Sequence, residues 1–198
     1  MKDFTIETYN KTASRYAKRH WRVSLWSRQY RDFTKLCKGK KILDAGSGPG
    51  RDTRYFLRKG YNVVSIDASQ GMLDEAKRRV PKGHFIKMDM LNLRFARNSF
   101  DGVWCCASLL HIRKSKASKV ISSFKNIIKE KGILFVSLKQ GKGERTVAYP
   151  DGSKRFFAYY TRPEAEKLIS KSFQMLKSYT HRDDEGDVWI SIFAEPRP

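Results

Sequence analysis

Strand-like and helix-like patterns alternate from Lys41 to Ser172, and this alternation limits the possible fold more than any other feature. Short apolar runs, typical of buried strands, are separated by stretches with the three- and four-residue steps of an amphipathic helix. Such an order predicts a mostly parallel sheet with helices on both faces. The predicted strands are 41–45, 61–67, 84–89, 100–107 and 132–139, and the predicted helices are 51–59, 71–80, 115–130 and 161–172.

Two other regions have a different character. Residues 4–19 and 22–37 have helical spacing, so residues 1–37 are expected to form N-terminal capping helices. Residues 140–160 are rich in glycine, basic and aromatic residues, and they are too long for an ordinary connection. We therefore expect this segment to cover the substrate side of the domain.

The C-terminal region predicts a different kind of pairing. Strands 173–181 and 187–195 are separated by the turn Asp183–Gly186 rather than by a helix. A short turn joins antiparallel strands, so the sheet should have an antiparallel C-terminal strand. The expected fold is one Rossmann-like, doubly wound α/β domain over residues 1–198, with a mostly parallel seven-stranded sheet.

The loop after the first strand is rich in glycine. Residues 42–52 read Ile-Leu-Asp-Ala-Gly-Ser-Gly-Pro-Gly-Arg-Asp and lead from a strand into a helix. In open α/β sheets this turn lies at the carboxyl edge, where ligands bind. Glycines let the backbone approach a ligand closely, and a helix N-terminus offers free N–H groups. Asp67 ends the next strand, twenty-one residues after Gly46, where a carboxylate suits a ribose diol.

Two classes of cofactor use this geometry, and the spacing separates them. The dinucleotide fingerprint is G-x-G-x-x-G, whereas this loop reads G-x-G-x-G and ends at Gly50. Asp44, just before the loop, would repel a pyrophosphate but attract an ammonium or sulfonium group. The glycine loop, Asp44 and Asp67 together favour S-adenosylmethionine over NAD.

These residues resemble motif I of the class I S-adenosylmethionine-dependent methyltransferases, and the resemblance extends over most of the chain. Residues 9–17 resemble the N-terminal helix that folds over the cofactor in that family, and residues 65–76 resemble motif II. Residues 87–90 look like the adenine motif, and residues 100–111 are similar to the fourth-strand motif. Lys131-Gly132 matches the family's K-P-G-G turn imperfectly. The subgroup resembled is the generic, tellurite-resistance-like type, whose small-molecule substrates vary widely.

The resemblance implies a complete cofactor site. The loop would approach the methionyl and ribose groups, and Asp44 would lie near the amino-acid end. Asp67 would bind the ribose hydroxyls, and Asp89 would accept a hydrogen bond from the adenine amino group. The residues implied in cofactor binding are Asp44, Gly46, Ser47, Gly48, Gly50, Asp67, Ala68, Met72, Asp89, Met90, Cys106 and Ala107.

Residues 106–111, at the end of the fourth strand, bear on the transfer step. They read Cys-Ala-Ser-Leu-Leu-His and lack the N/D-P-P-Y/F sequence of amino-directed nucleic-acid methyltransferases. His111 is the one histidine expected at this edge, and its titration range suits a catalytic base. The alternative is a histidine that packs at a strand–helix junction. No metal site is expected, because Cys105, Cys106 and His111 lack a fourth ligand with suitable spacing.

Substrate-binding residues are expected in the N-terminal helix and in residues 140–160. Arg145 and Arg155 could clamp a carboxylate or phosphate, while tyrosines line the pocket. The alternative is a solvated loop whose aromatic side chains pack on helices. The predicted substrate-binding residues are Tyr9, Tyr16, Arg145, Arg155, Tyr159 and Tyr160.

The net charge of the chain is compatible with more than one kind of partner. Forty-one Lys and Arg against twenty Asp and Glu give a net charge of +21. This excess indicates either a binding face for a polyanion or a solvated lysine-rich surface. We therefore expect at most weak, non-specific binding to nucleic acid.

Cysteine content and hydropathy suggest a compartment. Three cysteines, two of them adjacent, exclude a disulfide framework, and no apolar stretch is long enough for a membrane helix or a secretory signal. We therefore expect a cytoplasmic protein. The leading function is methyl transfer from S-adenosylmethionine to a small molecule. The alternatives are an RNA-directed methyltransferase and a non-catalytic cofactor- or nucleic-acid-binding protein of the same fold.

Overall fold

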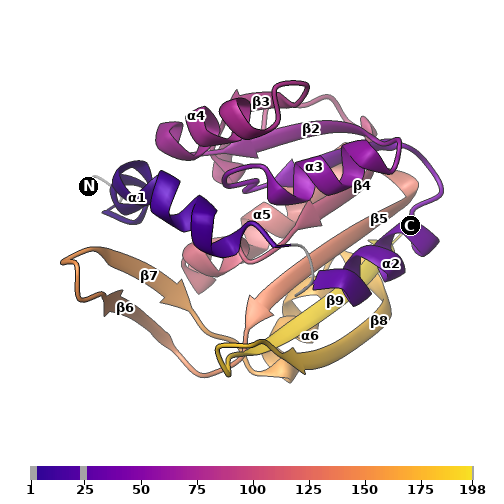
Figure 1. The fold of residues 1–198 in the computed structure, drawn as a ribbon. Helices are drawn as coiled ribbons and strands as arrows, with labels where there is room; N and C mark the ends of the chain where they lie inside the picture. Colours follow the sequence, from indigo (N-terminus) through magenta and orange to yellow (C-terminus); the bar gives the residue numbers. More distant parts are fainter. Residues whose placement is uncertain (1–3, 23–25, 198) are drawn as a thin grey trace.

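The computed structural model describes residues 4–22 and 26–197, and its centre is one seven-stranded sheet (Figure 1). The strands of this sheet are β1 (Lys41–Ala45), β2 (Asn62–Asp67), β3 (His84–Lys87), β4 (Phe100–Cys105), β5 (Ile128–Lys139), β8 (Phe173–Arg182) and β9 (Val188–Pro196). Their order is β3-β2-β1-β4-β5-β9-β8. The pairs from β3 to β5 are parallel, whereas β9 is antiparallel to both β5 and β8. The predicted fold class is confirmed.

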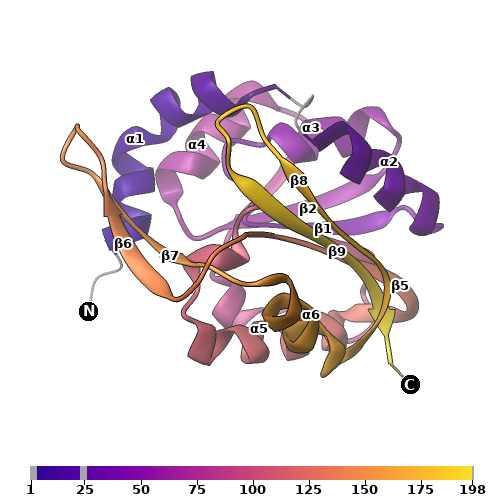
Figure 2. The ribbon, with the colours of Figure 1, turned by 90° about the horizontal axis from the view of Figure 1, so that it is seen from below.

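Helices lie on both faces of this sheet. They are α1 (Phe4–His20), α2 (Ser27–Leu36), α3 (Arg51–Arg58), α4 (Gln70–Arg79), α5 (Lys114–Ile127) and α6 (Arg162–Ser170), with short 3-10 turns η2 (Met90–Asn92) and η3 (Leu109–His111). α2, α3 and α4 cover one face, and α5 and α6 cover the other (Figure 2). Of the helices in the described ranges, none combines the length and the apolar character needed to cross a bilayer.

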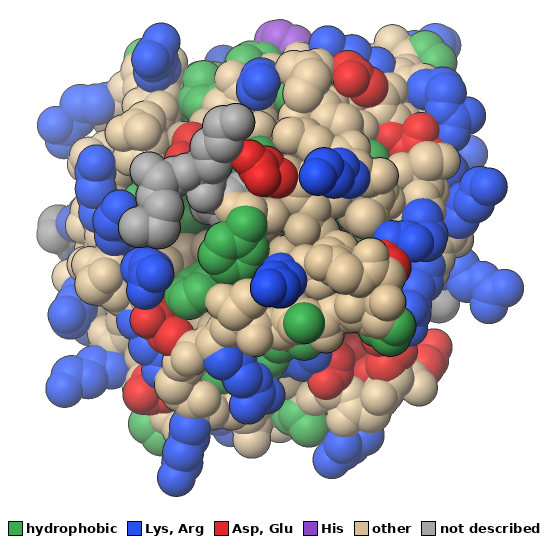
Figure 3. Space-filling view, turned by 90° about the vertical axis from the view of Figure 1, so that its left-hand side faces the viewer, with side chains coloured by type: hydrophobic (Ala, Val, Ile, Leu, Met, Phe, Trp, Pro, Cys, Tyr) green, Lys and Arg blue, Asp and Glu red, His purple; other side chains and the backbone are tan. Residues whose placement is uncertain are grey.

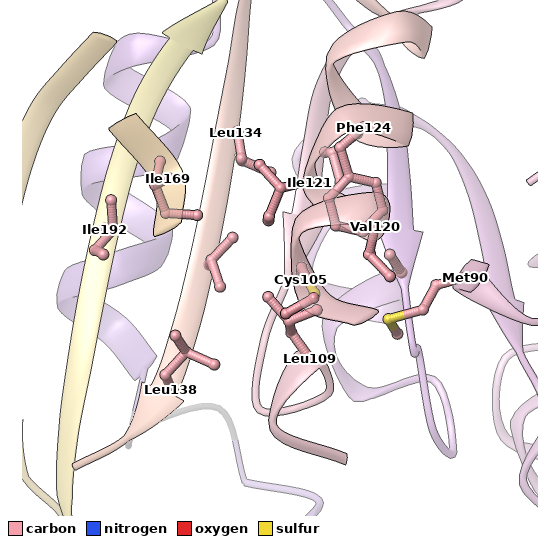
Figure 4. Close-up of a cluster of buried hydrophobic side chains, with 14 of the residues drawn as sticks. Met90, Cys105, Leu109, Val120, Ile121, Phe124, Leu134, Leu138, Ile169 and Ile192 are labelled. Atoms are coloured by element: carbon pink, nitrogen blue, oxygen red, sulfur yellow. The ribbon is translucent and has the colours of Figure 1, made fainter. Parts of the chain in front are cut away.

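The apolar core is divided by the sheet. On one face, Ile121 and Phe124 of α5 and Ile169 of α6 pack toward Leu134 of β5 and Ile192 of β9 (Figure 4). The second face buries aromatic rings instead, from α2, α3, β4 and β5. Each fully buried apolar side chain stabilises the fold by roughly 1.5–3 kcal/mol. This two-sided burial fixes the carboxyl edge of the parallel strands, where the glycine loop lies.

The largest differences from the predicted boundaries are at the starts of the second helix and of the fifth strand. The predicted helix 22–37 includes residues 23–25, which lie outside the described residues, and α2 begins at Ser27. β5 begins at Ile128, four residues before the predicted start, because Ile128 already pairs with Phe100 of β4. The apolar residues 127–128 fit the helical and the strand pattern equally well, so sequence periodicity could not separate the end of α5 from the start of β5.

Residues 140–160 contain a β-hairpin that the sequence prediction did not assign. Its strands are β6 (Glu144–Ala148) and β7 (Lys154–Ala158), and they pair antiparallel. β7 lies beside α1: Thr8 Oγ1 donates to the carbonyl of Lys154 over 2.7 Å, and Phe156 N donates to Thr5 Oγ1 over 3.0 Å. The first helix and the hairpin therefore form one connected cover.

Candidate functional site

The glycine loop between β1 and α3 needs glycine for two different reasons. Gly46 has φ +79°, and a Cβ there would lie 2.4 Å from the Ser108 Cβ, so a larger residue would collide with the turn after β4. Gly48 has φ +53°, yet a Cβ there would meet no atom within 4 Å. The backbone at Gly46 is therefore packed tightly against Ser108. At Gly48 it is open, so a ligand can approach it there.

The N–H groups of this loop already have acceptors. Gly46 N and Ser47 N both donate to the Ile66 carbonyl of β2 over 2.9 Å. Gly48 N donates to Asp67 Oδ2 over 2.9 Å, and Gly50 N donates to the Ser47 carbonyl over 3.1 Å. The N–H groups of these four loop residues are therefore occupied, whereas the expected free donors belong to the N-terminus of α3, which begins at Arg51. A pyrophosphate would find no free donor among the N–H groups of these four residues.

The loop borders a large cavity of about 760 Å³. Its wall comes from the ends of β1, β2, β3 and β4, from α1, from the hairpin and from the turn between β8 and β9. The predicted site residues that line it are Tyr9, Tyr16, Gly46, Ser47, Gly48, Asp67, Ala68, Met72, Asp89, Met90, Cys106, Ala107, His111 and Arg155.

Asp67 and Asp89 lie at two neighbouring strand ends of this cavity. Asp67 accepts from Gly48 N over 2.9 Å and from Ser69 N over 2.8 Å. Burial raises the pKa of Asp67 above its ordinary value, although the N–H donors oppose this shift. Asp89 accepts from Leu91 N over 2.9 Å. Each carboxylate is thus held by backbone and keeps acceptor capacity for a ligand.

Asp44 requires a correction. It is 1% exposed, does not line the cavity, and accepts a hydrogen bond from Thr53 Oγ1 over 2.7 Å. Burial, with the nearby carboxylate of Asp52 adding to it, holds the pKa of Asp44 well above its usual range. Asp44 therefore supports the loop from beneath and does not reach a ligand directly.

Asp52, which the prediction did not select, is the charged centre of this region. Arg51 binds it with Nη2 to Oδ2 at 3.0 Å, Trp104 Nε1 donates to Oδ2 over 2.8 Å, and the Tyr30 hydroxyl donates to Oδ1. Burial alone would raise the pKa of Asp52, but Arg51 and the hydrogen bonds from Tyr30 and Trp104 together outweigh burial, and the pKa lies below its usual range. Arg51 and Asp52 both line the cavity. The only sequence signal was the Arg-Asp pair directly after Gly50.

The end of β4 brings Cys106 and Ala107 to the cavity. Ser137 Oγ accepts from Ala107 N over 2.8 Å, and Ala107 has φ +51°, a conformation that L-residues rarely adopt. Burial raises the pKa of the Cys106 thiol well above its usual value, so the thiol stays protonated. The cysteines are all free. In the described ranges 4–22 and 26–197, His, Cys, Asp and Glu form no group of three that could hold a metal ion.

Tyr9 and His111 are hydrogen-bonded polar residues that line the cavity. His111 Nδ1 lies 2.7 Å from the Phe156 carbonyl, which can only accept, so this nitrogen carries a proton. In the neutral ring, Nε2 is then an acceptor, and it lies 2.8 Å from the Tyr9 hydroxyl. Arg155 Nη1 donates to the same hydroxyl over 3.3 Å. Burial, with Tyr16 adding to it, raises the pKa of Tyr9, so Tyr9 is a neutral donor.

Three predicted substrate-binding residues and one glycine do not line this cavity. Arg145 is exposed and lies over the Tyr159 ring at 4.2 Å, and Tyr159 and Tyr160 belong to the core beneath the hairpin. A Cβ on Gly50 would lie 3.2–3.3 Å from side chains of α4 and β3, so this glycine serves packing. Arg145, Tyr159 and Tyr160 therefore lie outside the lining of this cavity.

Sequence reasoning also missed an acidic wall of the cavity. The turn between β8 and β9 contributes Asp183, Asp184, Glu185 and Asp187. Asp187 pairs with Lys139 at 2.5 Å, and Glu185 pairs with Arg19 at 2.8 Å. The four acidic residues are visible in the sequence, but only the sheet order brings their turn to the cavity.

Comparison with known proteins agrees with this geometry. A family model described as a methyltransferase domain matches residues 42–132. The chain is 34% identical over 112 residues to a demethylmenaquinone methyltransferase of Renibacterium salmoninarum, a match over 57% of this chain and 46% of that protein. It is 39% identical over 64 residues to a malonyl-[acyl-carrier protein] O-methyltransferase of Enterobacter lignolyticus, which covers 32% and 26%. The matched segments span less than half the length of these curated relatives.

The fold is also found among solved structures. One is the 1,6-didemethyltoxoflavin-N1-methyltransferase of Burkholderia thailandensis, solved with 1,6-didemethyltoxoflavin and S-adenosylhomocysteine bound. Its TM-score is 0.75 at 21% sequence identity, over 98% of this chain and 88% of that chain. At this identity the likeness concerns the fold, which it covers almost from end to end.

Proposed function

We propose that the chain, which resembles the class I S-adenosylmethionine-dependent methyltransferases, transfers a methyl group from S-adenosylmethionine to a small-molecule acceptor. The observation that carries this proposal is the pairing of Asp67 with the open backbone of Gly48 at one end of a cavity of about 760 Å³. The demethylmenaquinone and malonyl-[acyl-carrier protein] methyltransferases to which the chain is similar act on acceptors that are not nucleic acids.

The residues of the cavity fit the cofactor. Within the described chain, Ser47 Oγ is buried without a hydrogen-bond partner, although it borders the cavity, so a polar ligand would satisfy it. The space above Gly48 admits a ligand against the backbone, and the shortage of free loop N–H groups disfavours a pyrophosphate. These features favour a cofactor that has a ribose but no phosphate.

Different residues of the cavity would hold the ribose, the adenine and the methionine part of S-adenosylmethionine. Asp67 would bind the ribose hydroxyls, and Asp89 and Met90 would lie at the adenine. Ser47, Gly48 and the strand-four residues Cys106 and Ala107 would border the methionine part. When bound, S-adenosylmethionine supplies a methyl group already activated by the positive sulfur, so the protein needs mainly to align the acceptor and exclude water.

The chain also offers a path for a proton. An acceptor that arrives as a hydroxyl or an amine must lose a proton as it gains the methyl group. We propose that Tyr9 Oη takes this proton while it passes its own proton to His111 Nε2. The Phe156 carbonyl, which accepts from Nδ1, then holds the imidazolium in place. His111 is thus the catalytic base and Tyr9 is the group that connects it to the acceptor.

The acidic turn supports a small acceptor over a nucleic acid. Asp183 and Asp184 line the cavity and would repel a polyphosphate there, whereas Glu185 and Asp187 are paired with Arg19 and Lys139. The cavity volume lies within the range of roughly 300–1,000 Å³ that is usual for sites of small molecules. On the face shown in Figure 3, Lys and Arg side chains are scattered and mixed with acidic ones rather than gathered into a continuous patch.

Calorimetry and a turnover assay test the proposal together. We expect S-adenosylhomocysteine to bind and NAD not to bind, and we expect pooled metabolites, but not pooled RNA, to drive conversion of S-adenosylmethionine to S-adenosylhomocysteine. Methyl incorporation into RNA would favour the RNA-directed alternative. Binding without conversion in any pool would favour the non-catalytic alternative.

The net charge of +21 motivates a further part of the proposal. We propose a cytoplasmic protein that binds nucleic acid only weakly and without sequence preference. Such binding should fall steeply with salt, whereas the acceptor's KM should change little, because each phosphate contact contributes about one unit of logarithmic slope. A steep salt dependence of KM would contradict this.

A further inference from the structure

Arg155 of β7 is the one half-buried cation of the cavity wall without a carboxylate partner in the described chain. The other half-buried cations that line the cavity are neutralised. Arg51 pairs with Asp52 and Lys139 pairs with Asp187. The remaining lining Lys and Arg residues are exposed at the rim, where water solvates them.

The guanidinium of Arg155 lies among aromatic rings. Its Cζ lies 4.2 Å from the ring centroid of Tyr149, 5.5 Å from that of Tyr9 and 5.6 Å from that of Phe157. Its hydrogen bonds include the 3.3 Å contact from Nη1 to the Tyr9 hydroxyl. A guanidinium has five N–H donors, and its hydrogen-bond partners here include the hydroxyls of Tyr9 and Tyr149, so donor capacity remains for an anionic ligand.

The position of Arg155 is fixed by the backbone on either side. The carbonyl and N–H of Lys154 both contact Thr8 Oγ1, at 2.7 Å and 3.3 Å, and Phe156 N donates to Thr5 Oγ1. The Phe156 carbonyl in turn accepts from His111. The guanidinium and the proposed base are therefore held by the same strand, next to each other.

From this geometry we infer that the acceptor is a monoanion, and that Arg155 binds its carboxylate while Tyr9 and His111 receive the atom to be methylated. The inference rests on the proposed function and adds the chemical class of the acceptor. A carboxylate matches the planar fork of a guanidinium with two parallel hydrogen bonds. The neighbouring Phe157 and Val147 suit an apolar or aromatic body attached to it.

The acidic turn explains why a monoanion fits better than a phosphate. Arg155 lines the cavity from the hairpin, whereas the turn between β8 and β9 contributes Asp183 and Asp184, beside Glu185 and Asp187, which are paired with Arg19 and Lys139. A dianion would gain no second cation from Arg155 and would meet more repulsion from the turn. A single carboxylate balances Arg155 alone.

Binding of benzoate to the protein saturated with S-adenosylhomocysteine tests the inference by calorimetry. We expect benzoate to bind wild type at least tenfold more tightly than neutral benzamide or phenyl phosphate. Arg155→Gln should remove this preference, and Arg155→Lys should recover only part of it because the fork is lost. Arg145→Gln is the matched control: it removes an arginine of the same hairpin that does not line the cavity, and it should bind benzoate as wild type does.

The outcomes separate the inference from the function on which it rests. Equal binding of benzoate and benzamide, tighter binding of phenyl phosphate, or no benzoate binding would each overturn the inference while leaving the cofactor site intact. Weaker S-adenosylhomocysteine binding in Arg155→Gln, with unchanged benzoate binding, would assign Arg155 to the cofactor's own carboxylate and overturn it as well. Failure of S-adenosylhomocysteine to bind wild type would instead overturn the proposed function.

Discussion

The Tyr9 hydroxyl lies 2.8 Å from His111 Nε2, although 102 positions separate the two residues in the chain. Tyr9 comes from α1 and His111 from the 3-10 turn after β4, so the contact exists only when the first helix lies over the sheet edge. The two rings also meet edge to face, with centroids 5.3 Å apart. The proton path from Tyr9 to His111 therefore forms only when α1 is in this position.

Tyr9→Phe and His111→Gln test this pair. Each should lower kcat, by about 10²–10⁴-fold for loss of a general base, because the acceptor's proton loses its path. The double variant should be no slower than His111→Gln alone, since both residues act in one chain. S-adenosylhomocysteine affinity should stay near wild type in all three. Tyr61→Phe removes a hydroxyl that donates to the Cys37 carbonyl and serves as the control. Additive losses would contradict a shared path.

Asp67→Ala should weaken S-adenosylhomocysteine binding about tenfold or more, because a charge-assisted hydrogen bond contributes roughly 1.5–3 kcal/mol. Calorimetry measures the affinity, and thermal unfolding checks that the variant folds. Asp74→Ala, on the exposed side of α4, should bind as wild type does. Unchanged affinity in Asp67→Ala would remove this residue from the cofactor site.

Asp44→Asn should behave differently from Asp67→Ala. Burial favours the neutral form of Asp44, which an amide resembles, and the Asn side chain can still accept from Thr53 Oγ1. We expect S-adenosylhomocysteine affinity within about threefold of wild type, a difference of less than 1 kcal/mol. A loss as large as that in Asp67→Ala would restore a direct role for Asp44 in binding.

Asp52→Ala should lower the free energy of unfolding by about 3–5 kcal/mol, because Arg51 would remain as an unpaired charge in a largely buried site. Denaturation in urea measures this quantity. Asp151→Ala removes an exposed partner of Arg15 and should cost at most about 1 kcal/mol. Similar losses in both variants would show that the Arg51–Asp52 pair is not the centre that holds the start of α3.

His20 should make stability depend on pH. Burial, with Arg19 and Arg51 adding to it and Glu185 opposing it, lowers the pKa of His20 from its ordinary value to about 4. Between about pH 6.5 and 4 the unfolded chain therefore binds more protons than the folded one, so the free energy of unfolding falls as the pH falls.

His20→Gln should reduce this slope, as measured by urea denaturation across the same pH range. His84→Gln, which replaces an exposed histidine on β3, should keep the wild-type slope. An identical slope in wild type and His20→Gln would contradict the role of His20.

Much of the fold followed from local patterns in the sequence. Apolar runs, helical spacing and turn residues are short-range properties, and they placed β1, β2, β4 and the helix α6. The spacing Gly46, Gly48, Gly50 and the carboxylate at the end of β2 indicated the cofactor class for the same reason. All of them belong to one strand–loop–helix–strand unit, whose geometry its own residues determine.

Other features depended on long-range packing, which no local pattern contains. The hairpin over residues 144–158 presents mixed polar and aromatic residues because one of its faces borders a cavity, so its strands lacked a plain alternation. Asp44 and Arg145 looked like ligand-binding residues until burial beneath the loop and exposure on the hairpin placed them elsewhere.

The sequence by itself determined the class of fold, the glycine loop and the acidic ends of β2 and β3, because these arise from residues that are neighbours in the chain. Only the tertiary structure decided which side chains meet across the cavity. It joined Tyr9 to His111, left Arg155 without a carboxylate partner among the described residues, and brought the acidic turn of residues 183–187 to the wall. Such meetings depend on the order β5-β9-β8 and on how α1 packs against β7, which are set by burial of the whole core.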